Sequence, residues 1–253
     1  MRITQEYLDE IRQSGRNMLR PDWKLWNPRK TDSAKNTAPP APYKEMNGAH
    51  IVALDTEQMD TLYDKPLGVC IANRRSVRKY SKEPIGKQTL SYLLWHTGRI
   101  QKKGAARSLR PVPSAGACHC LETYVYAARV ADVPAGLYHY HPAKSALELV
   151  CDTDGLADKI DKALFNQMFG AAAVFLWTAV PYRMEYRYSV VSHKMIAIEA
   201  GHICQNLYLA AQAAGCGCCA ISAYDQKAID AAVGIDGEEE FTIYAAVAGS
   251  RCD

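Results

Sequence analysis

The pattern of apolar and polar positions divides the chain into two unequal parts. Residues 3–19 carry apolar side chains at roughly helical spacing, which predicts a helix. A polar, proline-containing run follows at residues 31–43, and from residue 67 onward the apolar positions are dense enough for a buried core. We therefore expect an N-terminal arm and linker over residues 1–45 and one main domain over residues 46–253.

Apolar side chains spaced three or four residues apart predict helices over residues 86–98 and 195–214. A shorter helix is expected over residues 225–234, because an aspartate at its start can accept hydrogen bonds from the first backbone amides. Gly98 can end the first of these helices, and Gly215 stands where a left-handed cap would end the second.

Strand-forming residues dominate residues 121–130 and 241–249, and residues 136–140 are expected to pair with 146–150 in a hairpin. The continuously apolar run at residues 171–180 is too short to span a membrane and predicts a buried central strand. Helices and hairpin-linked strands mix without regular alternation. This order favours an α+β sandwich, with a mainly antiparallel sheet flanked by helices, over a doubly wound parallel sheet.

Charge and cysteine content exclude some classes of partner and compartment. Lys and Arg number 30 against 27 Asp and Glu, so the net charge of +3 is too small to indicate nucleic acid or an anionic membrane. Nine cysteines form an odd set that argues against a disulfide framework. Residues 1–30 contain no apolar run typical of a signal peptide, so we expect a cytoplasmic protein without a membrane span.

Three segments carry candidate chemistry. Residues 74–80, RRSVRKY, hold several strong donors within six residues, namely Arg74, Arg75, Ser76, Arg78 and Lys79. These donors could converge on one phosphate, or they could form a solvated basic surface. The small-residue loop VPSAG at 112–116 suits close approach to a flat ligand, although an ordinary turn is the alternative. Arg251 follows the last expected strand and could add charge to the same anion.

Together these segments resemble the nitroreductase superfamily, and specifically its SagB-type branch of azoline-oxidising dehydrogenases. The resemblance covers roughly residues 67–251 and is carried by RRSVRKY at 74–80, VPSAG at 112–116, YRMEYRY at 182–188, EAGHICQNLYLAA at 199–211 and VGIDGEEE at 233–240. It implies a nitroreductase-like fold, a homodimer with a long helix at the interface, and FMN as the cofactor.

The resemblance also implies which residues hold the cofactor. Arg74, Ser76 and Arg78 would contact the phosphate and the ribityl chain of FMN. Arg251 would add to the phosphate site, and Arg75 is a further candidate from the same basic segment.

Other matched positions would lie near the flavin ring. Pro113 and Ser114 would pack beside it from the second subunit of the dimer. The segment AISAYD at 220–225 matches the place where family members direct backbone amides at flavin N5, which makes Ser222 and Ala223 the candidates.

Arg187 and Tyr188 match an adjacent lysine and tyrosine that azole-forming relatives use to remove a substrate proton. They are our candidate catalytic residues. Arginine keeps its proton at physiological pH and is a poor general base, so the match argues against azoline oxidation. Arg183, Arg187 and Tyr188 could instead bind an anionic or carbonyl substrate above the flavin, or the arginines could form structural ion pairs.

The histidines and clustered cysteines are interpreted structurally. We expect His202 to be a hydrogen-bonded core histidine. His119, His139 and His141 match no established metal-ligand spacing, so no metal site is predicted. The CGCC run at 216–219 is expected to hold buried free thiols.

The expected activity is that of an FMN-dependent oxidoreductase, which transfers a hydride through flavin N5 by a ping-pong mechanism. No Rossmann or Walker motif occurs, so NAD(P)H would reach the flavin site as a transient substrate while reducing a small-molecule acceptor. Two alternatives stay open: a dehydrogenase acting on a heterocycle in a biosynthetic pathway, and a catalytically inactive flavin-binding protein.

Overall fold

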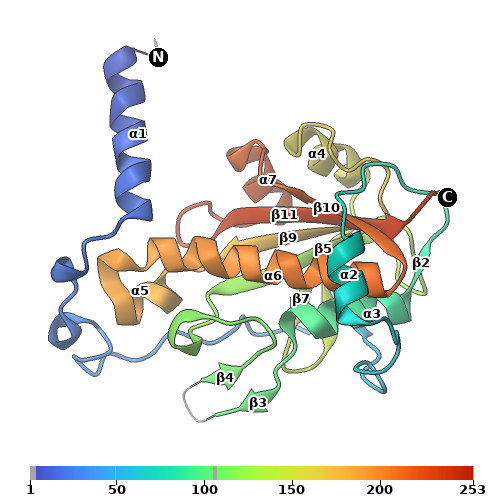
Figure 1. Cartoon of the computed structure of the whole chain (residues 1–253), viewed down its shortest axis with the longest axis horizontal. Helices are drawn as coiled ribbons and strands as arrows, with labels where there is room; N and C mark the ends of the chain where they lie inside the picture. The colour runs from blue at the N-terminus through green and yellow to red at the C-terminus, as the bar shows by residue number, and fades with distance from the viewer. Residues whose placement is uncertain (1–3, 49, 105–106, 253) are drawn as a thin grey trace.

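A seven-stranded sheet forms the centre of the molecule in the computed structural model, which describes residues 4–48, 50–104 and 107–252 (Figure 1). Its order is β1-β8-β7-β5-β9-β11-β10, and all neighbouring strands are antiparallel. The strands are β1 (Ile51–Ala53), β5 (Leu121–Ala127), β7 (Gly136–His141), β8 (Ala146–Cys151), β9 (Ala173–Ala179), β10 (Cys216–Ile221) and β11 (Phe241–Ser250). Two small pairs lie outside this sheet, namely β2 (Ile85–Gly86) with β6 (Val130–Ala131), and β3 (Lys102–Lys103) with β4 (Ser108–Leu109).

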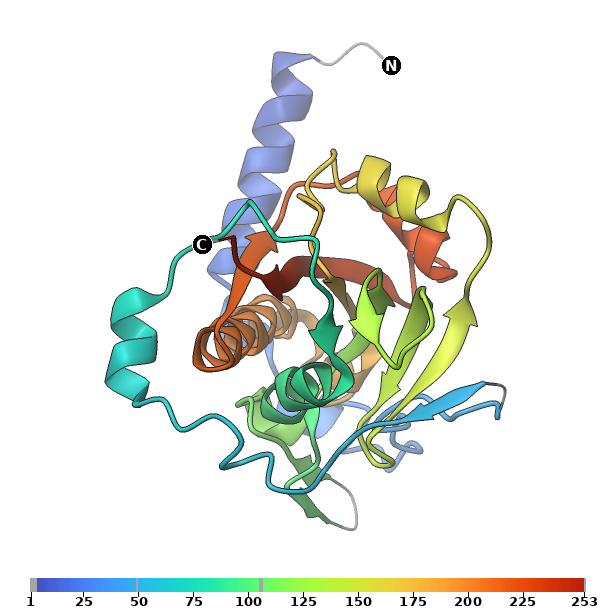
Figure 2. The same cartoon turned by 90° about the vertical axis from the view of Figure 1, so that its right-hand side faces the viewer.

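Helices cover both faces of the sheet. One face packs against α3 (Lys87–Gly98) and α6 (His193–Ala213), and the other against α4 (Leu156–Ala163) and α7 (Gln226–Val233) (Figure 2). Alternate residues of β9 therefore enter two separate cores: Trp177 faces α6, whereas Leu176 faces α4 and α7. Because both faces are buried, every residue of β9 is apolar or hydrogen-bonded, which confirms the predicted central strand.

The other helices are α1 (Gln5–Leu19), α2 (Leu67–Asn73) and α5 (Tyr182–Tyr188), with short 3-10 turns η1 (Trp23–Leu25), η2 (Pro28–Lys30), η3 (Ala115–Ala117) and η4 (Ser189–Val191). The helix predicted over residues 3–19 is α1, although residue 3 lies outside the described part. The α1 helix buries none of its residues and projects from the body of the molecule (Figure 1). Its amphipathic sequence therefore forms a helix without a core to cover.

The two glycines expected to end helices behave differently. Gly215 has a φ of +71° directly after α6, as a left-handed cap requires. Gly98 is instead the last residue of α3, and a Cβ there would lie 2.9 Å from Cε1 of Tyr140. The helix therefore ends at Gly98 as predicted, and the missing side chain also allows close packing of α3 against β7.

Residues 31–44, here called the strap, lie against α5. The backbone carbonyl oxygen of Tyr186 accepts a hydrogen bond from the backbone N–H of Ser33 at 3.0 Å. Nε of Arg183 donates to the carbonyl oxygen of Ala41 at 2.8 Å. The strap is thus held in place by groups of α5, while the predicted division between arm and domain stays a prediction.

Candidate active site

The basic segment 74–80 lies against β10, which is the edge strand of the sheet. The backbone N–H of Val77 donates to the carbonyl oxygen of Cys218 at 2.9 Å. A Cβ on Gly217 would lie only 2.8 Å from Cγ1 of Val77, so this close approach requires glycine. The sequence CGCC therefore provides the flat strand surface on which the basic segment rests.

Three arginines gather around this segment without acidic partners. The guanidinium of Arg74 lies 5.2 Å from the ring centre of Tyr208 on α6, and the hydroxyl of Tyr208 is 2.9 Å from Oγ of Ser76. Arg78 is exposed, and Arg251 donates from Nε to the first carbonyl oxygen of β10 at 3.1 Å. Within residues 4–48, 50–104 and 107–252, none of these arginines forms an ion pair. Their positive charge is left for another group.

The remaining predicted cofactor residues follow the same strand. Ser222 and Ala223 come directly after β10 and are exposed, at the opposite end from Arg251. About 20 Å separates the two ends, at roughly 3.3 Å per residue of strand. Arg75 is turned away, since its Nη1 donates to the carbonyl oxygen of Ala72 at 3.2 Å. The edge of β10 therefore joins a cationic end to an end where Ser222 and Ala223 are exposed.

A second cluster surrounds the loop that contains Pro113 and Ser114. Oγ of Ser114 donates to Glu199 of α6 at 2.5 Å and accepts from the backbone N–H of His119 at 2.9 Å. Burial raises the pKa of Glu199, which the hydrogen bond from Ser114 opposes. A cavity of about 310 Å³ lies at this point, lined by Pro113, Ser114, Ala115, Met195, Ile198, Glu199 and His202.

Arg187 and Tyr188 meet the same loop. Gly116 has a φ of +59°, and a Cβ on it would lie 2.6 Å from the Tyr188 hydroxyl and 2.9 Å from Nη1 of Arg187. Only glycine fits this position. Trp26 of the arm donates from Nε1 to the carbonyl oxygen of Arg187 at 3.2 Å. The structure therefore brings both predicted catalytic residues together with the loop at 112–116.

The two clusters lie at opposite ends of α6. Tyr208 contacts the basic segment, whereas Glu199 contacts Ser114; the two positions are nine residues apart, which corresponds to about 14 Å of helix. Figure 1 shows α2, which precedes the basic segment, near one end of α6 and α5 at the other. Within one chain, Pro113 and Ser114 are thus not beside the segment 74–80.

The two arginines of α5 have different surroundings. Nη2 of Arg183 lies 2.6 Å from Glu122, which also accepts from His139 at 2.8 Å. Burial opposes ionisation of Glu122, but the His139 hydrogen bond and the Arg183 charge outweigh it and lower the pKa of Glu122 to about 2. Arg183 is thus a structural ion-pair residue, whereas Arg187 forms no ion pair with any described residue.

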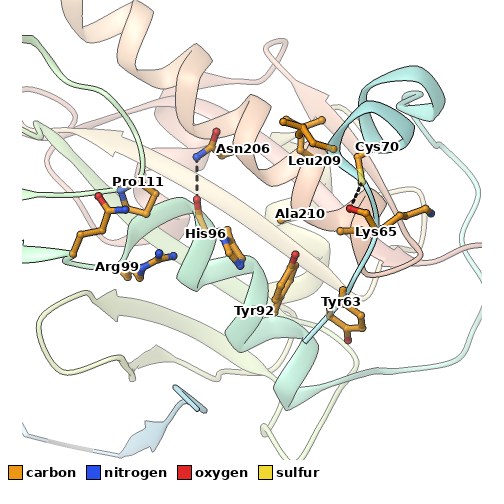
Figure 3. A pocket seen from close by; sticks show the side chains of 13 residues that line it. Tyr63, Lys65, Cys70, Tyr92, His96, Arg99, Pro111, Asn206, Leu209 and Ala210 are labelled. Atoms are coloured by element: carbon orange, nitrogen blue, oxygen red, sulfur yellow. Dashed lines mark hydrogen bonds between the residues drawn. The ribbon is translucent and has the colours of Figure 1, made fainter. Parts of the chain in front are cut away.

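A further cavity of about 370 Å³ lies between α3, α6 and residues 63–70 (Figure 3). Asn206 of α6 donates to the carbonyl oxygen of His96 at 3.0 Å across one side of it. Burial lowers the pKa of His96, so its ring is neutral at physiological pH. Lys65 reaches the carbonyl oxygen of Gln212 at 3.1 Å, which ties this loop to the end of α6 near the basic segment.

Sequence comparison decides the family. The chain matches the Nitroreductase family over residues 71–250. A Methanocaldococcus jannaschii protein described as a nitroreductase is 31% identical over 169 residues, which make up 66% of this chain and 83% of that relative. The chain belongs to the nitroreductase family. The predicted superfamily is therefore confirmed.

Solved structures share the fold of this nitroreductase-family chain at identities below 25%. A Ralstonia eutropha protein described as a nitroreductase has a TM-score of 0.65 at 22% identity, covering 84% of this chain and 100% of that one. An Anabaena variabilis protein of the same description has a TM-score of 0.63 at 24% identity. The match covers 74% of this chain but only 38% of the length of that protein. A chain of the Escherichia coli microcin synthetase McbBCD complex, solved with truncated pro-MccB17 bound, has a TM-score of 0.63 at 17% identity. The match covers 99% of this chain and 95% of that one. The predicted α+β fold class is confirmed.

Some side-chain predictions for this nitroreductase-family protein need correction. His202 is exposed on α6, with Nδ1 3.3 Å from the carbonyl oxygen of Pro113, so its predicted core position is wrong. The thiols at 216–219 are buried on β10, as predicted. Tyr208 and Glu199 were not singled out from the sequence. Both lie in the segment at 199–211 that carries the resemblance, but helical spacing alone does not show which site each one faces.

Within the described ranges, no group of three or more His, Cys, Asp or Glu side chains is placed to hold a metal ion. None of the helices in the described part is long and apolar enough to cross a membrane.

Proposed function

We propose that this protein is an FMN-dependent oxidoreductase that reduces a small-molecule acceptor with NAD(P)H by a ping-pong mechanism. Family membership supplies the general class, because nitroreductases generally use flavin cofactors. The observation that carries the proposal is the group of three arginines near Ser76 at the edge of β10, none of which forms an ion pair with a described residue. Guanidinium groups bind phosphate through charge-assisted hydrogen bonds.

The residues present fit a flavin mononucleotide along this edge. Its phosphate and ribityl chain would be held by Arg74, Ser76, Arg78 and Arg251, with Arg75 less well oriented because it donates to its own backbone. The backbone amides of Ser222 and Ala223 would lie near the ring, at the far end of β10. When bound, the flavin supplies hydride transfer at N5.

A homodimer would complete the site, because Pro113 and Ser114 lie at the other end of α6 from the basic segment. Apolar side chains that a partner could cover are exposed near both ends of α6. Ile198 on α6 is 46% exposed, and Leu67 on α2 is 64% exposed. We propose that two copies pack along α6, so that the loop at 112–116 of one subunit meets segment 74–80 of the other.

Arg187 and Tyr188 would then orient the substrate beside the flavin ring. Arg187 stays protonated at physiological pH, so it can bind and polarise an acceptor but cannot remove a proton as a base. The Tyr188 hydroxyl can donate a hydrogen bond or a proton to a reduced product. This chemistry favours reduction of an acceptor over dehydrogenation of an azoline.

The second candidate is dehydrogenation of a heterocycle in a biosynthetic pathway. It is favoured by the structural likeness to a chain of the microcin synthetase complex, which extends over 99% of this chain and 95% of that one. A match over 99% of this chain includes the N-terminal arm. The substitution of arginine at 187 for the expected lysine argues against it.

Anaerobic reduction of the purified protein tests both candidates. We expect it to release FMN on denaturation, to lose its flavin absorbance when NADH or NADPH is added, and to regain it with a nitroaromatic or quinone acceptor. Failure of both nucleotides to bleach bound FMN would remove the NAD(P)H proposal; bleaching by an azoline peptide would then support the second candidate. A colourless protein that takes up no added FMN would contradict the cofactor assignment.

A further inference from the structure

A cavity of about 190 Å³ lies between the strap and α5, on the side of Arg187. Prolines of the strap form one part of its wall, and three basic side chains form another: Pro39, Pro40, Pro42, Arg107, Arg183 and Arg187. We call it the arginine cavity. Its described lining contains no Asp or Glu; Glu122 outside the lining pairs with Arg183, whereas Arg107 and Arg187 form no ion pair with any described residue.

Two of the lining arginines each have one buried guanidinium nitrogen without a hydrogen-bond partner among the described residues. Arg183 is only 6% exposed; its Nη2 is paired with Glu122 and its Nε with the strap, but Nη1 has no partner among the described residues. Nη1 of Arg187 is buried and likewise unpartnered within the described part of the chain. A buried charged donor without a partner costs free energy, which an anion in the cavity would recover.

The histidine and the cysteine of the cavity lining add no negative charge. Burial, aided by the charge of Arg110, lowers the pKa of His119 to about 4, so its ring is neutral at pH 7. Burial also raises the pKa of Cys118, which keeps it a thiol. Arg107 directs Nη1 to the carbonyl oxygen of Gly116 at 3.1 Å, which leaves its charge at the cavity.

We infer that the arginine cavity binds a carboxylate group of the substrate. The planar guanidinium presents parallel donors that match the two oxygens of a carboxylate. The cavity is small, so it suits a compact acid group rather than a whole cofactor. Arg187 joins this cavity to Gly116 and the loop at 112–116, so a substrate anchored here would extend toward the proposed flavin ring. The inference rests on the proposed function for the identity of the reacting ring.

The first test compares 4-nitrobenzoate with nitrobenzene as acceptors for the NADH-reduced enzyme. We expect a higher kcat/KM for the carboxylate, and a loss of that preference of about tenfold or more in Arg187→Gln and Arg107→Gln. Arg29→Gln is the matched control, because Arg29 is an exposed arginine of η2 outside the cavity. Equal kcat/KM values for both acceptors in the native enzyme would overturn the inference.

The second test measures equilibrium binding and does not depend on turnover. Titration calorimetry with benzoate and with benzyl alcohol should show tighter binding of benzoate, weakened about tenfold by Arg187→Gln. Arg187→Lys should retain part of the preference, since it keeps the charge but not the planar fork. Benzoate that binds no better than benzyl alcohol would overturn the carboxylate site.

The two proposals can fail separately. Arginine-dependent benzoate binding in a protein that no nicotinamide nucleotide reduces would refute the proposed function and support the cavity. Flavin turnover without any preference for carboxylate acceptors would support the proposed function and refute the carboxylate site.

Discussion

The two ends of α6 carry two kinds of site built on different principles. At the C-terminal end, Tyr208 faces Arg74 and Ser76, which belong to one short segment and lie at the surface. At the N-terminal end, the buried Glu199 accepts a hydrogen bond from the half-buried Ser114. The first arrangement presents cationic side chains that form no ion pair with any described residue, whereas the second holds a buried carboxyl group by a hydrogen bond.

This difference has an energetic consequence. Solvated surface charges contribute little to folding, so their removal should weaken ligand binding and leave the fold intact. Buried charges stabilise one another only as a set, so the loss of one leaves its partner uncompensated. Variants at the two ends should therefore separate flavin affinity from folding stability.

The largest expected effect is on flavin affinity at the open end. Arg74→Ala combined with Arg78→Ala removes two charge-assisted contacts worth about 1.5–3 kcal/mol each, which weakens FMN binding by roughly 10²–10⁴-fold. Fluorescence titration of the flavin-free protein with FMN measures the change. The melting temperature of the flavin-free variant should match that of the native protein.

Arg75→Ala is the comparison variant, because Arg75 donates to carbonyl oxygens of its own segment. We expect its effect on FMN affinity to be much smaller. Unchanged flavin content in the double variant would remove the basis for the phosphate assignment.

At the buried end, Glu122→Gln should reduce stability rather than flavin affinity. The substitution leaves Arg183 buried without its counter-ion, which costs about 3–5 kcal/mol. Urea unfolding of the flavin-free protein measures the loss, with the exposed Glu83→Gln as control. A loss below about 1 kcal/mol would show that Arg183 finds other compensation in the strap.

The same carboxyl predicts how stability depends on pH. The pKa of Glu122 is about 2 in the fold, below its value of about 4.3 in an unfolded chain. Its contribution is therefore complete above pH ~4.3 and is lost as the pH falls toward 2. Melting temperatures between pH 6 and pH 2.5 should fall less steeply for Glu122→Gln. Parallel curves for the two proteins would contradict the assigned pKa shift.

The smallest effect is expected where the open end meets the core. Gly217→Ala places a Cβ against Val77, which should cost about 1–3 kcal/mol of stability and displace the basic segment. FMN affinity should fall severalfold in the same titration. Gly15→Ala in α1 is the control, because a Cβ added there would meet no neighbouring heavy atom within 4 Å. This substitution should leave FMN affinity unchanged.

The sequence predicted the elements well because their signals are local. The apolar run at 171–180 became β9, and the spacing at 195–214 became α6. Gly98 ends α3 as its local signal predicts, but its contact with the ring of Tyr140 could not be predicted, because Tyr140 lies on a strand distant in sequence. The sequence did not predict that the strap lines a cavity, because a polar, proline-containing run is equally typical of a free linker.

Arg183 and Arg187 show what each level of structure decided. The sequence alone determined that two arginines lie four residues apart within the segment at 182–188 that resembles nitroreductases. Only the tertiary structure decided that Arg183 is neutralised by Glu122, which lies 61 residues away, while Arg187 keeps an unpartnered nitrogen within the described part of the chain. The sign of each side-chain charge follows from the residue type, but its ion-pair partner depends on which strand the fold places opposite the helix.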